Sequence, residues 1–296
     1  MRALITGGSG FVGQHLADRL SRPIIVGRSI EKLKHKFADS EVRQWDGSPN
    51  ADPSLLTGVD TIFHLAGESL FHGRWNAEKK AKIRASRIEG TSHLVDLIGR
   101  AELKPATLIC SSAVGYYGSR GDEELTERSA PGHDFLAQVC QDWEHEARRA
   151  AEYGVRVVLI RTGVVLGEDG GALAQMLRPF RLGLGGRLGN GRQYMSWIHI
   201  DDLTAIMLLA MNNDQLRGPL NAVTPFPVTN REFTRVLADT LHRPALLPIP
   251  GCILKMALGE FAEVLLGSQR VRPAVLQQTG YSYLFPTIAA ALQKLL

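Results

Sequence analysis

Close to its start the chain carries the stretch Ala3-Leu4-Ile5-Thr6-Gly7-Gly8-Ser9-Gly10-Phe11-Val12-Gly13, a short apolar run followed by a glycine-rich loop. In a strand-turn-helix unit the first glycine permits the tight turn, the second lets the backbone approach a pyrophosphate, and the third lets the helix pack close to the strand. Similar glycine loops also join strands to helices without binding a ligand. Because this loop directly follows an apolar run and precedes an amphipathic segment, we predict a dinucleotide site that includes Gly7, Gly10 and Gly13.

Strand-like and helix-like patterns alternate from this loop to about residue 160. Further short apolar runs lie at Ile24–Val26, Thr61–Leu65, Thr107–Cys110 and Val155–Ile160, and segments of helical period separate them. Near-continuous apolar strands that alternate with helices indicate a parallel sheet covered on both faces. We therefore expect an α/β protein with a Rossmann-like, doubly wound parallel sheet.

The pattern changes in the second half of the chain. Residues 163–191 are dense in glycine, and prolines punctuate the chain from about residue 218 onward. We expect residues 1–165, with later segments at about 190–225, to form the nucleotide-binding domain. Residues 166–190 and 226–296 are expected to form a smaller, mostly helical C-terminal substrate lobe.

The composition and the charge pattern argue against a nucleic-acid-binding protein and against a metal site. The 34 basic residues are interleaved with 30 acidic ones, so the net charge of +4 lacks the clustering typical of nucleic-acid binding. The cysteines, Cys110, Cys140 and Cys252, form no CxxC pair, which favours reduced thiols and no metal site. No targeting signal is read at the N-terminus. We expect a cytoplasmic protein with a small-molecule substrate and no nucleic-acid partner; the pattern does not indicate an oligomeric state.

One apolar stretch could suggest a membrane partner. Residues 253–266 are rich in apolar side chains but include Lys255, Glu260 and Glu263. A stretch of this length is too short to span a bilayer, and its charges oppose insertion. We interpret it as a core-facing helix and expect no membrane association.

The residues after the second apolar run bear on the choice of dinucleotide. An acidic side chain at that point would accept a hydrogen bond from the ribose 2′-hydroxyl and repel a 2′-phosphate. The sequence instead has Gly27-Arg28-Ser29, in which a guanidinium and a hydroxyl suit the extra phosphate. Arg28 and Ser29 therefore favour NADP(H); the alternative is that Arg28 is a solvated surface arginine.

Several motifs together resemble one family. They lie at residues 6–13, 64–68, 74–76, 86–87, 111–118 and 161–167, and later at 183–186, 191–193, 196–199 and 227–230. The chain resembles the atypical extended short-chain dehydrogenase/reductases, which are NAD-dependent epimerase/dehydratase-like proteins called epimerase family proteins or nucleoside-diphosphate-sugar epimerases; some carry the label of cell-division inhibitor. The tail from Pro250 through Tyr281 resembles the domain of unknown function that closes those proteins.

The resemblance implies a set of NADP(H) contacts. They fall on Gly7, Gly10, Phe11, Val12, Arg28, Ser29, Leu65, Ala66, Lys82, Arg87 and Arg161. Gly13 belongs to the glycine loop, and Gly67 follows the run at 61–65, where the carboxyl edge of a parallel sheet lines the ligand crevice. The alternative for Arg87 is a surface ion pair with Glu89 or Glu78.

The predicted catalytic residues depart from the usual pattern of the extended reductases. Extended reductases use a Tyr-x-x-x-Lys pair, in which the lysine cation lowers the tyrosine pKa beside the nicotinamide. The corresponding stretch here has Leu136 and Cys140, neither of which can do this chemistry. Ser112, Tyr116 and Tyr117 are the candidate substitutes; alternatively, both tyrosines pack within their loop.

Substrate contacts are predicted at three further residues and one arginine-rich segment. Ser111 follows the fourth apolar run, and Trp197 and His199 lie in the motif at 196–199. The alternative is that Trp197 fills the core and His199 bonds to backbone. Arginines in the glycine-dense segment would suit an anionic substrate, although they could equally be solvated; they are Arg178, Arg181, Arg187 and Arg192.

Two functions remain open on these observations. The first is an NADP(H)-binding oxidoreductase or epimerase of the extended short-chain reductase type, acting on an anionic or nucleotide-linked substrate. The second is an NADP(H)-sensing regulatory binding protein with little catalysis, acting in cell division as the labels of some similar proteins imply. The cofactor site supports the first function, and the missing Tyr-x-x-x-Lys pair supports the second.

Overall fold

A seven-stranded parallel sheet forms the centre of the computed structural model, which describes residues 1–71, 73 and 75–296. The strand order is β11-β7-β5-β4-β1-β2-β3, and all six neighbouring pairs run parallel. This confirms the predicted Rossmann-like α/β fold. The strands are β1 (Ala3–Thr6), β2 (Ile24–Gly27), β3 (Glu41–Gln44), β4 (Thr61–His64), β5 (Thr107–Ala113), β7 (Arg156–Thr162) and β11 (Gly218–Ala222).

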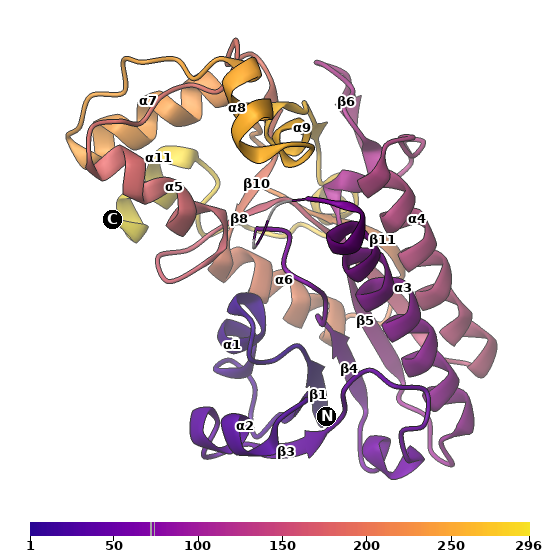
Figure 1. Ribbon diagram of the computed structural model, residues 1–296. Coiled ribbons are helices and arrows are strands. Elements are labelled where there is room, and N and C mark those ends of the chain that lie inside the picture. The colour runs from indigo at the N-terminus through magenta and orange to yellow at the C-terminus, as the bar shows by residue number, and fades with distance from the viewer. Residues whose placement is uncertain (72, 74) are drawn as a thin grey trace.

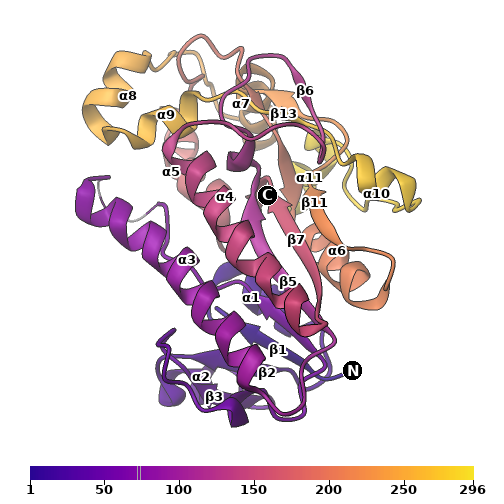
Figure 2. The same ribbon diagram turned by 90° about the vertical axis from the view of Figure 1, so that its right-hand side faces the viewer.

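Helices cover both faces of the sheet (Figure 1). Successive strand residues point to opposite faces: Ile5 packs in one buried cluster with residues of α1, α2 and α6, and Leu4 packs in another with residues of α3 and α4. Figure 2 shows α3 and α4 running together across their face. These helices are α1 (Phe11–Ala17), α2 (Ile30–Lys36), α3 (Ala77–Arg100), α4 (Phe135–Arg148) and α6 (Ile200–Asn212).

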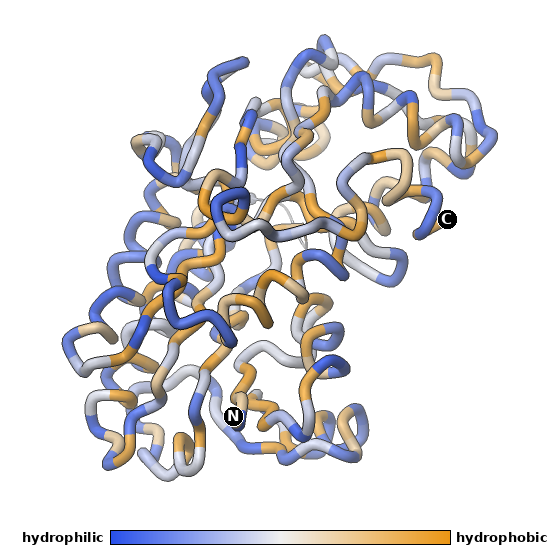
Figure 3. The backbone as a smooth tube through the Cα atoms, turned by 180° about the vertical axis from the view of Figure 1, so that it is seen from behind, coloured by the Kyte–Doolittle hydropathy of each residue, from blue (hydrophilic) through white to orange (hydrophobic). Residues whose placement is uncertain are grey.

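The smaller lobe has its own core. Leu173, Phe180, Phe233, Leu237 and Leu292 belong to one buried cluster. The backbone of the lobe helices alternates between hydrophilic and hydrophobic colours, as expected for helices with one face buried (Figure 3). The remaining helices are α5 (Gly171–Arg181), α7 (Asn230–Leu241), α8 (Gly251–Leu258), α9 (Phe261–Leu266), α10 (Ala274–Gln278) and α11 (Ile288–Leu295).

Three short strand pairs and three 3₁₀ helices complete the described elements. The pairs are β8 (Val164–Leu166) with β10 (Trp197–His199), β9 (Tyr194–Met195) with β12 (Val228–Thr229), and β6 (Glu124–Leu125) with β13 (Arg270–Val271). The 3₁₀ helices are η1 (Pro53–Leu56), η2 (Val114–Tyr117) and η3 (Arg149–Tyr153). The domain boundaries stay a prediction, with one qualification: Leu276 of α10 packs in the core of the sheet rather than in that of the lobe.

The apolar stretch at 253–266 is not the single core-facing helix expected from its sequence. Gly259, at φ +61°, ends α8 and separates it from α9. Ile253 and Met256 are 48% and 75% exposed, and within α8 only Leu254 is buried. None of the helices formed by the described residues has both the length and the apolar character needed to cross a bilayer.

Candidate functional site

The glycine loop packs directly against the end of β4. Gly7 has φ +73°, and a Cβ added there would lie 2.7 Å from the backbone nitrogen of Ala66. A Cβ at Gly13 would lie 2.5 Å from the carbonyl oxygen of Gly7. Both positions therefore require glycine, and the loop lies at the carboxyl edge of the sheet, where doubly wound proteins bind nucleotides.

Phe11 connects this loop to the second half of the chain. Its ring occupies the space that side chains at Gly167, Gly170 and Gly171 would need, and it meets the His15 ring edge to face at 5.1 Å. Three glycines of the segment assigned from sequence to substrate binding thus have a packing role. The predicted cofactor contacts of Phe11 and Val12 stay predictions.

Arg28 is exposed at the end of β2. Among the described residues no carboxylate forms an ion pair with it, whereas its backbone carbonyl accepts a hydrogen bond from Gln44 Nε2 at 3.2 Å. Ser29 caps α2, because its hydroxyl accepts from the backbone N–H of Lys32 at 3.5 Å. The β2 edge therefore presents an unneutralised guanidinium beside a hydroxyl.

The end of β4 lies next to Arg87 of α3. Leu65 and Ala66 are half-buried and Gly67 is exposed; a Cβ at Gly67 would lie 3.2 Å from Arg87 Cζ. Arg87 Nη1 donates to the carbonyl oxygen of Glu68 at 3.0 Å, and burial lowers the pKa of the guanidinium. Arg87 thus forms no ion pair with Glu78 or Glu89, which were its alternative partners on the surface. Its guanidinium lies beside Gly67, at the carboxyl edge of the sheet.

Lys82 has a different environment on the same helix. Its ammonium forms an exposed i,i+4 ion pair with Glu78 at 2.6 Å, and the hydrogen bond to Glu78 raises the pKa of Lys82. This is an ordinary surface pair on a helix. The predicted cofactor contact of Lys82 stays a prediction that the geometry does not support further.

Arg161, Ser112 and Tyr117 meet in a buried network. Arg161 Nε and Nη2 donate to the two carboxylate oxygens of Glu144 at 2.7 and 2.8 Å, and its Nη1 donates to the Tyr117 hydroxyl at 3.0 Å. Ser112 Oγ donates to the same carboxylate at 2.8 Å. Tyr117 donates in turn to Asn221 Oδ1 at 2.7 Å.

This network bears on three sequence-based assignments. The exposed fractions of Arg161, Ser112 and Tyr117 are 1%, 4% and 0%, and burial raises the pKa of Tyr117 to about 12. The two hydroxyls and the guanidinium are thus buried and hydrogen-bonded to one another or to Glu144 and Asn221. Through these contacts the three residues stabilise the end of β5, and their predicted roles in cofactor binding and catalysis stay predictions. Their partners Glu144 and Asn221 were not predicted, because both come from distant segments of the chain.

Tyr116 and Ser111 are differently placed, since both are half-buried. The Tyr116 ring lies over the Arg161 guanidinium, with Cζ 3.5 Å from the ring centroid, and it meets the Tyr117 ring edge to face. Within the described part of the chain neither side-chain hydroxyl forms a hydrogen bond. Of the two adjacent tyrosines, Tyr116 is therefore the one whose hydroxyl has no hydrogen-bond partner among the described residues.

Leu136 and Cys140 of α4 lie beside the same edge. A Cβ at Gly115 in η2 would lie 3.5 Å from Leu136 Cβ and 3.9 Å from Cys140 Sγ. Cys140 is 4% exposed, and burial raises the pKa of its thiol to about 12. The two positions where a Tyr-x-x-x-Lys pair would stand thus hold an apolar side chain and a neutral thiol.

Trp197 and His199 are structural residues. Trp197 is 0% exposed, and its Nε1 donates to the carbonyl oxygen of Phe226 at 3.3 Å. His199 is 2% exposed and caps α6, because Nδ1 accepts from the backbone N–H of Asp201 at 3.0 Å. Its ring stacks at 4.0 Å on Phe285, and burial lowers its pKa. Both side chains are buried in the interior, as the alternative for each of them expected, and their predicted substrate contacts stay predictions without support from the geometry.

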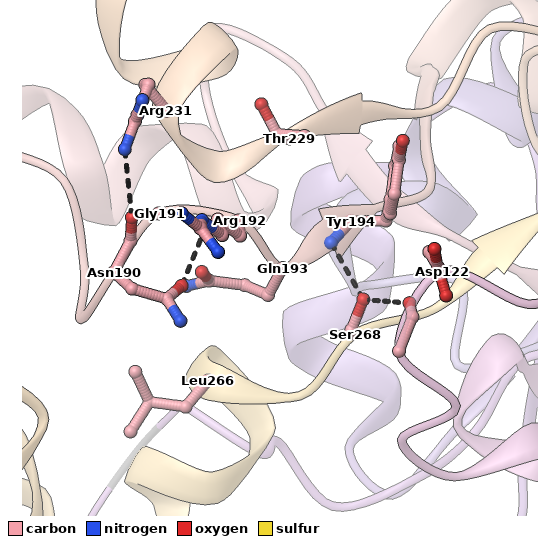
Figure 4. Close-up of a pocket in the computed structure, with 11 residues that line it drawn as sticks. Asp122, Asn190, Gly191, Arg192, Gln193, Tyr194, Thr229, Arg231, Leu266 and Ser268 are labelled. Atoms are coloured by element: carbon pink, nitrogen blue, oxygen red, sulfur yellow. Dashed lines mark hydrogen bonds between the residues drawn. The ribbon is translucent and has the colours of Figure 1, made fainter.

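A cavity of about 600 Å³ lies in the lobe between the start of α7 and the end of α9. Figure 4 shows Arg192 and Arg231 on one side of it and Tyr194 and Asp122 on the other. Arg192 was among the arginines predicted to suit an anionic substrate; Arg231 was not. Arg74, part of one family motif, lies outside the described residues.

Comparison with known sequences identifies the family. A family described as "NAD dependent epimerase/dehydratase family" matches residues 3–222, and a domain of unknown function, DUF1731, matches residues 249–295. The chain belongs to the NAD-dependent epimerase/dehydratase family. An epimerase family protein of Mycobacterium leprae is 41% identical over 291 residues, which cover 97% of this chain and 93% of that protein.

Relatives in this family extend to plants and humans. The chloroplastic SDR39U1 homolog of Arabidopsis thaliana is 38% identical, covering 100% of this chain and 87% of that protein. The crystal structure of human epimerase family protein SDR39U1 with NADPH has a TM-score of 0.90 and 34% identity, covering 100% of this chain and 99% of that one. The predicted resemblance is confirmed at the level of the epimerase/dehydratase family and its C-terminal domain.

Proposed function

We propose that this epimerase/dehydratase-family protein binds NADP(H) at the carboxyl edge of its sheet. The observation that carries the proposal is Arg28, an exposed guanidinium at the end of β2 that has no carboxylate partner among the described residues. A 2′-phosphate would pair with it, whereas a free 2′-hydroxyl would not. The NADPH in the human relative, which is 34% identical over the whole chain, supports the same choice.

The residues of the crevice fit such a cofactor. The glycine loop leaves no room for a Cβ at Gly7 or Gly13, so its backbone is free to approach a pyrophosphate. Arg28 and Ser29 would hold the 2′-phosphate, and Leu65, Ala66 and Gly67 would line the crevice beside the loop. Arg87 lies near Gly67 and near the α4 helix that carries Cys140, and would face the nicotinamide half. When bound, the cofactor would supply or accept a hydride.

The reaction that this site supports is oxidoreduction or epimerisation of the extended short-chain reductase type. Tyr116 would transfer the proton, since its hydroxyl is free of hydrogen bonds to other described residues, and Ser111 would hold a substrate oxygen. The arginines of the lobe favour an anionic or nucleotide-linked substrate. In this assignment Arg161 acts on Tyr116 by holding its ring from one side.

A second function, an NADP(H)-sensing binding protein with little turnover, has one observation in its favour. Leu136 and Cys140 occupy the positions of the usual acid-base pair, and Cys140 is kept neutral by burial. A chain that keeps the cofactor site without that pair could report on the NADPH level to a partner rather than convert a substrate.

Calorimetric titration of NADPH and NADH tests the cofactor proposal. We expect wild type to prefer NADPH, and Arg28→Ala to weaken NADPH binding tenfold or more while leaving NADH binding unchanged, because the lost contact is to the 2′-phosphate. Lys34→Ala removes another exposed cation from α2 and serves as the control. Equal binding of both nucleotides by wild type would refute the NADP(H) assignment.

A second experiment separates the two functions. Purified protein is supplied with NADP(H) and a panel of nucleotide-linked and phosphorylated sugars, and hydride transfer is followed by absorbance and epimerisation by NMR. Turnover that falls at least a hundredfold in Tyr116→Phe, with unchanged NADPH affinity, supports the enzyme. Tight NADPH binding without turnover of any compound supports the sensor.

A further inference from the structure

A second cavity, of about 320 Å³, lies against α7 in the lobe. Four arginines line it: Arg187 from the segment before β9, Arg231 and Arg235 from α7, and Arg243 from the residues that follow α7. In both ribbon views α7 lies at the opposite end of the molecule from β1 and β3 (Figures 1 and 2), and none of the residues that line the cavity belongs to the glycine loop. The cavity is therefore separate from the proposed dinucleotide crevice.

The charges around this cavity are unbalanced. Asp239 is the one carboxylate that lines it, and its closest approach to Arg235 is 3.5 Å. Within the described chain Arg187, Arg231 and Arg243 form no ion pair. Four guanidinium groups thus share a small concave space with one carboxylate, and this excess of positive charge attracts an anion.

The local backbone brings two of these arginines together. Gly191 has φ +70°, and a Cβ there would lie 3.2 Å from Arg231 Cβ and 3.3 Å from Arg187 Cδ. The Arg231 backbone N–H donates to the Gly191 carbonyl oxygen at 2.9 Å, which fixes the start of α7 on this segment. A side chain at position 191 would separate the two arginine stems.

Two of the guanidinium groups are also oriented by backbone carbonyl oxygens. Arg231 Nη2 donates to Asn190 at 3.4 Å, as Figure 4 shows, and Arg243 Nε donates to Arg181 at 3.2 Å. Each contact uses one N–H group and leaves the others of the planar fork available. Forked donors held in this way match the oxygens of a phosphate group.

We propose that this arginine cavity binds a small molecule that carries two adjacent phosphate groups. The cavity has the size of a small-ligand site. It also has an apolar part, formed by Ala238, Pro244 and Ala245, and a buried threonine, Thr234, whose hydroxyl forms no hydrogen bond within the described chain. These features favour a compact phosphorylated metabolite over the extended backbone of a nucleic acid, which would need a longer basic face. The proposal does not depend on the dinucleotide assignment.

Calorimetry with inorganic pyrophosphate as the probe tests this proposal. Pyrophosphate is titrated with and without saturating NADPH, so that binding at the glycine loop is distinguished from binding in the lobe. For NADPH-loaded wild type we expect one site, and at least a tenfold loss of pyrophosphate affinity in the Arg187→Ala/Arg243→Ala double variant with unchanged NADPH affinity. Arg217→Ala removes an exposed arginine away from the cavity and should behave as wild type.

Each other outcome overturns the proposal. Absence of a pyrophosphate site in NADPH-loaded wild type, or equal losses in the double variant and in Arg217→Ala, would show that no specific anion site exists. A short single-stranded oligonucleotide that binds through the same arginines, where pyrophosphate does not, would show that the surface serves a nucleic acid instead. Arg243→Gln is the milder variant if the double variant fails to fold, and it should weaken pyrophosphate binding at least threefold.

Discussion

Arg161 and Glu144 form an ion pair in the interior, with two N–H groups of the guanidinium on the two carboxylate oxygens at 2.7 and 2.8 Å. Both side chains are almost fully buried, at 1% and 0% exposure. The pair joins β7 to α4, and through Ser112 and Tyr117 it also reaches β5 and η2. The end of β5, where the proposed chemistry takes place, thus depends on this pair.

Removal of one partner should be costly. We expect Glu144→Gln to lower the free energy of unfolding by about 3–5 kcal/mol, because it leaves a buried guanidinium without its counter-charge. Urea denaturation measures the change. Glu123→Gln, in an exposed pair with Arg120, should cost at most about 1 kcal/mol. Similar values for the two variants would show that the buried pair has no special role.

The stability should fall on mild acidification because of His64. Burial lowers the pKa of His64 from 6.5 to about 4, and its ring nitrogens bond to Thr6 and Thr91. Below pH 6.5 the unfolded chain takes up a proton that the folded chain does not accept until about pH 4. Stability present above pH 6.5 is therefore lost as the pH falls, by about 2 kcal/mol between pH 7 and pH 5.

Urea denaturation at several pH values checks this prediction. His64→Gln should remove that part of the pH dependence whatever its effect on absolute stability, and His35→Gln, at an exposed position of α2, should keep it. A His64→Gln profile parallel to wild type would contradict the assignment.

If NADP(H) binds as proposed, Arg28 and Arg87 should contact different halves of it. Arg28→Ala should weaken both NADPH and adenosine 2′,5′-bisphosphate tenfold or more, since both carry the 2′-phosphate. Arg87→Ala should weaken NADPH but not the bisphosphate, which lacks the nicotinamide half. Calorimetric titration of both ligands into each variant measures these affinities. A loss of bisphosphate affinity in Arg87→Ala would show that Arg87 does not contact the nicotinamide half alone.

The glycine loop offers a steric test. Gly13→Ala would bring a Cβ to 2.5 Å from the Gly7 carbonyl oxygen, so α1 must shift, and NADPH affinity should fall at least tenfold. Gly90→Ala is the matched control, because its Cβ would meet nothing within 4 Å; in the middle of α3 it should stabilise the fold by about 0.5–1 kcal/mol. Unchanged NADPH affinity in Gly13→Ala would show that the glycine loop is not part of the cofactor site.

The parts of the fold that could be predicted from the sequence are those whose residue types follow a pattern over a short stretch of the chain. Apolar runs predicted β1, β2, β4, β5 and β7, because buried parallel strands need apolar side chains on both faces. The edge strand β3 escaped detection since Glu41–Gln44 is largely polar and only partly covered. The glycine loop was recognisable because its spacing reflects local backbone geometry.

The surroundings of several predicted site residues depend on contacts between segments that are distant in the sequence. Ser112 and Arg161 lie in β5 and β7, but the carboxylate that both of them contact, Glu144, comes from α4. His199 was expected at the crevice and instead caps its own helix. Such pairings are decided by packing in three dimensions, for which the sequence has no short-range signal.

The ring of Phe11 has a further consequence for access to the crevice. The ring extends from the glycine loop into the space left by Gly167, Gly170 and Gly171. The Phe11 side chain therefore joins the glycine loop to residues 167–171. The two segments cannot separate at this point unless the ring is withdrawn. Opening of the crevice at Phe11 would have to withdraw the ring and disturb the glycine loop, so ligand exchange should take place along the margin of the crevice that lies away from Phe11.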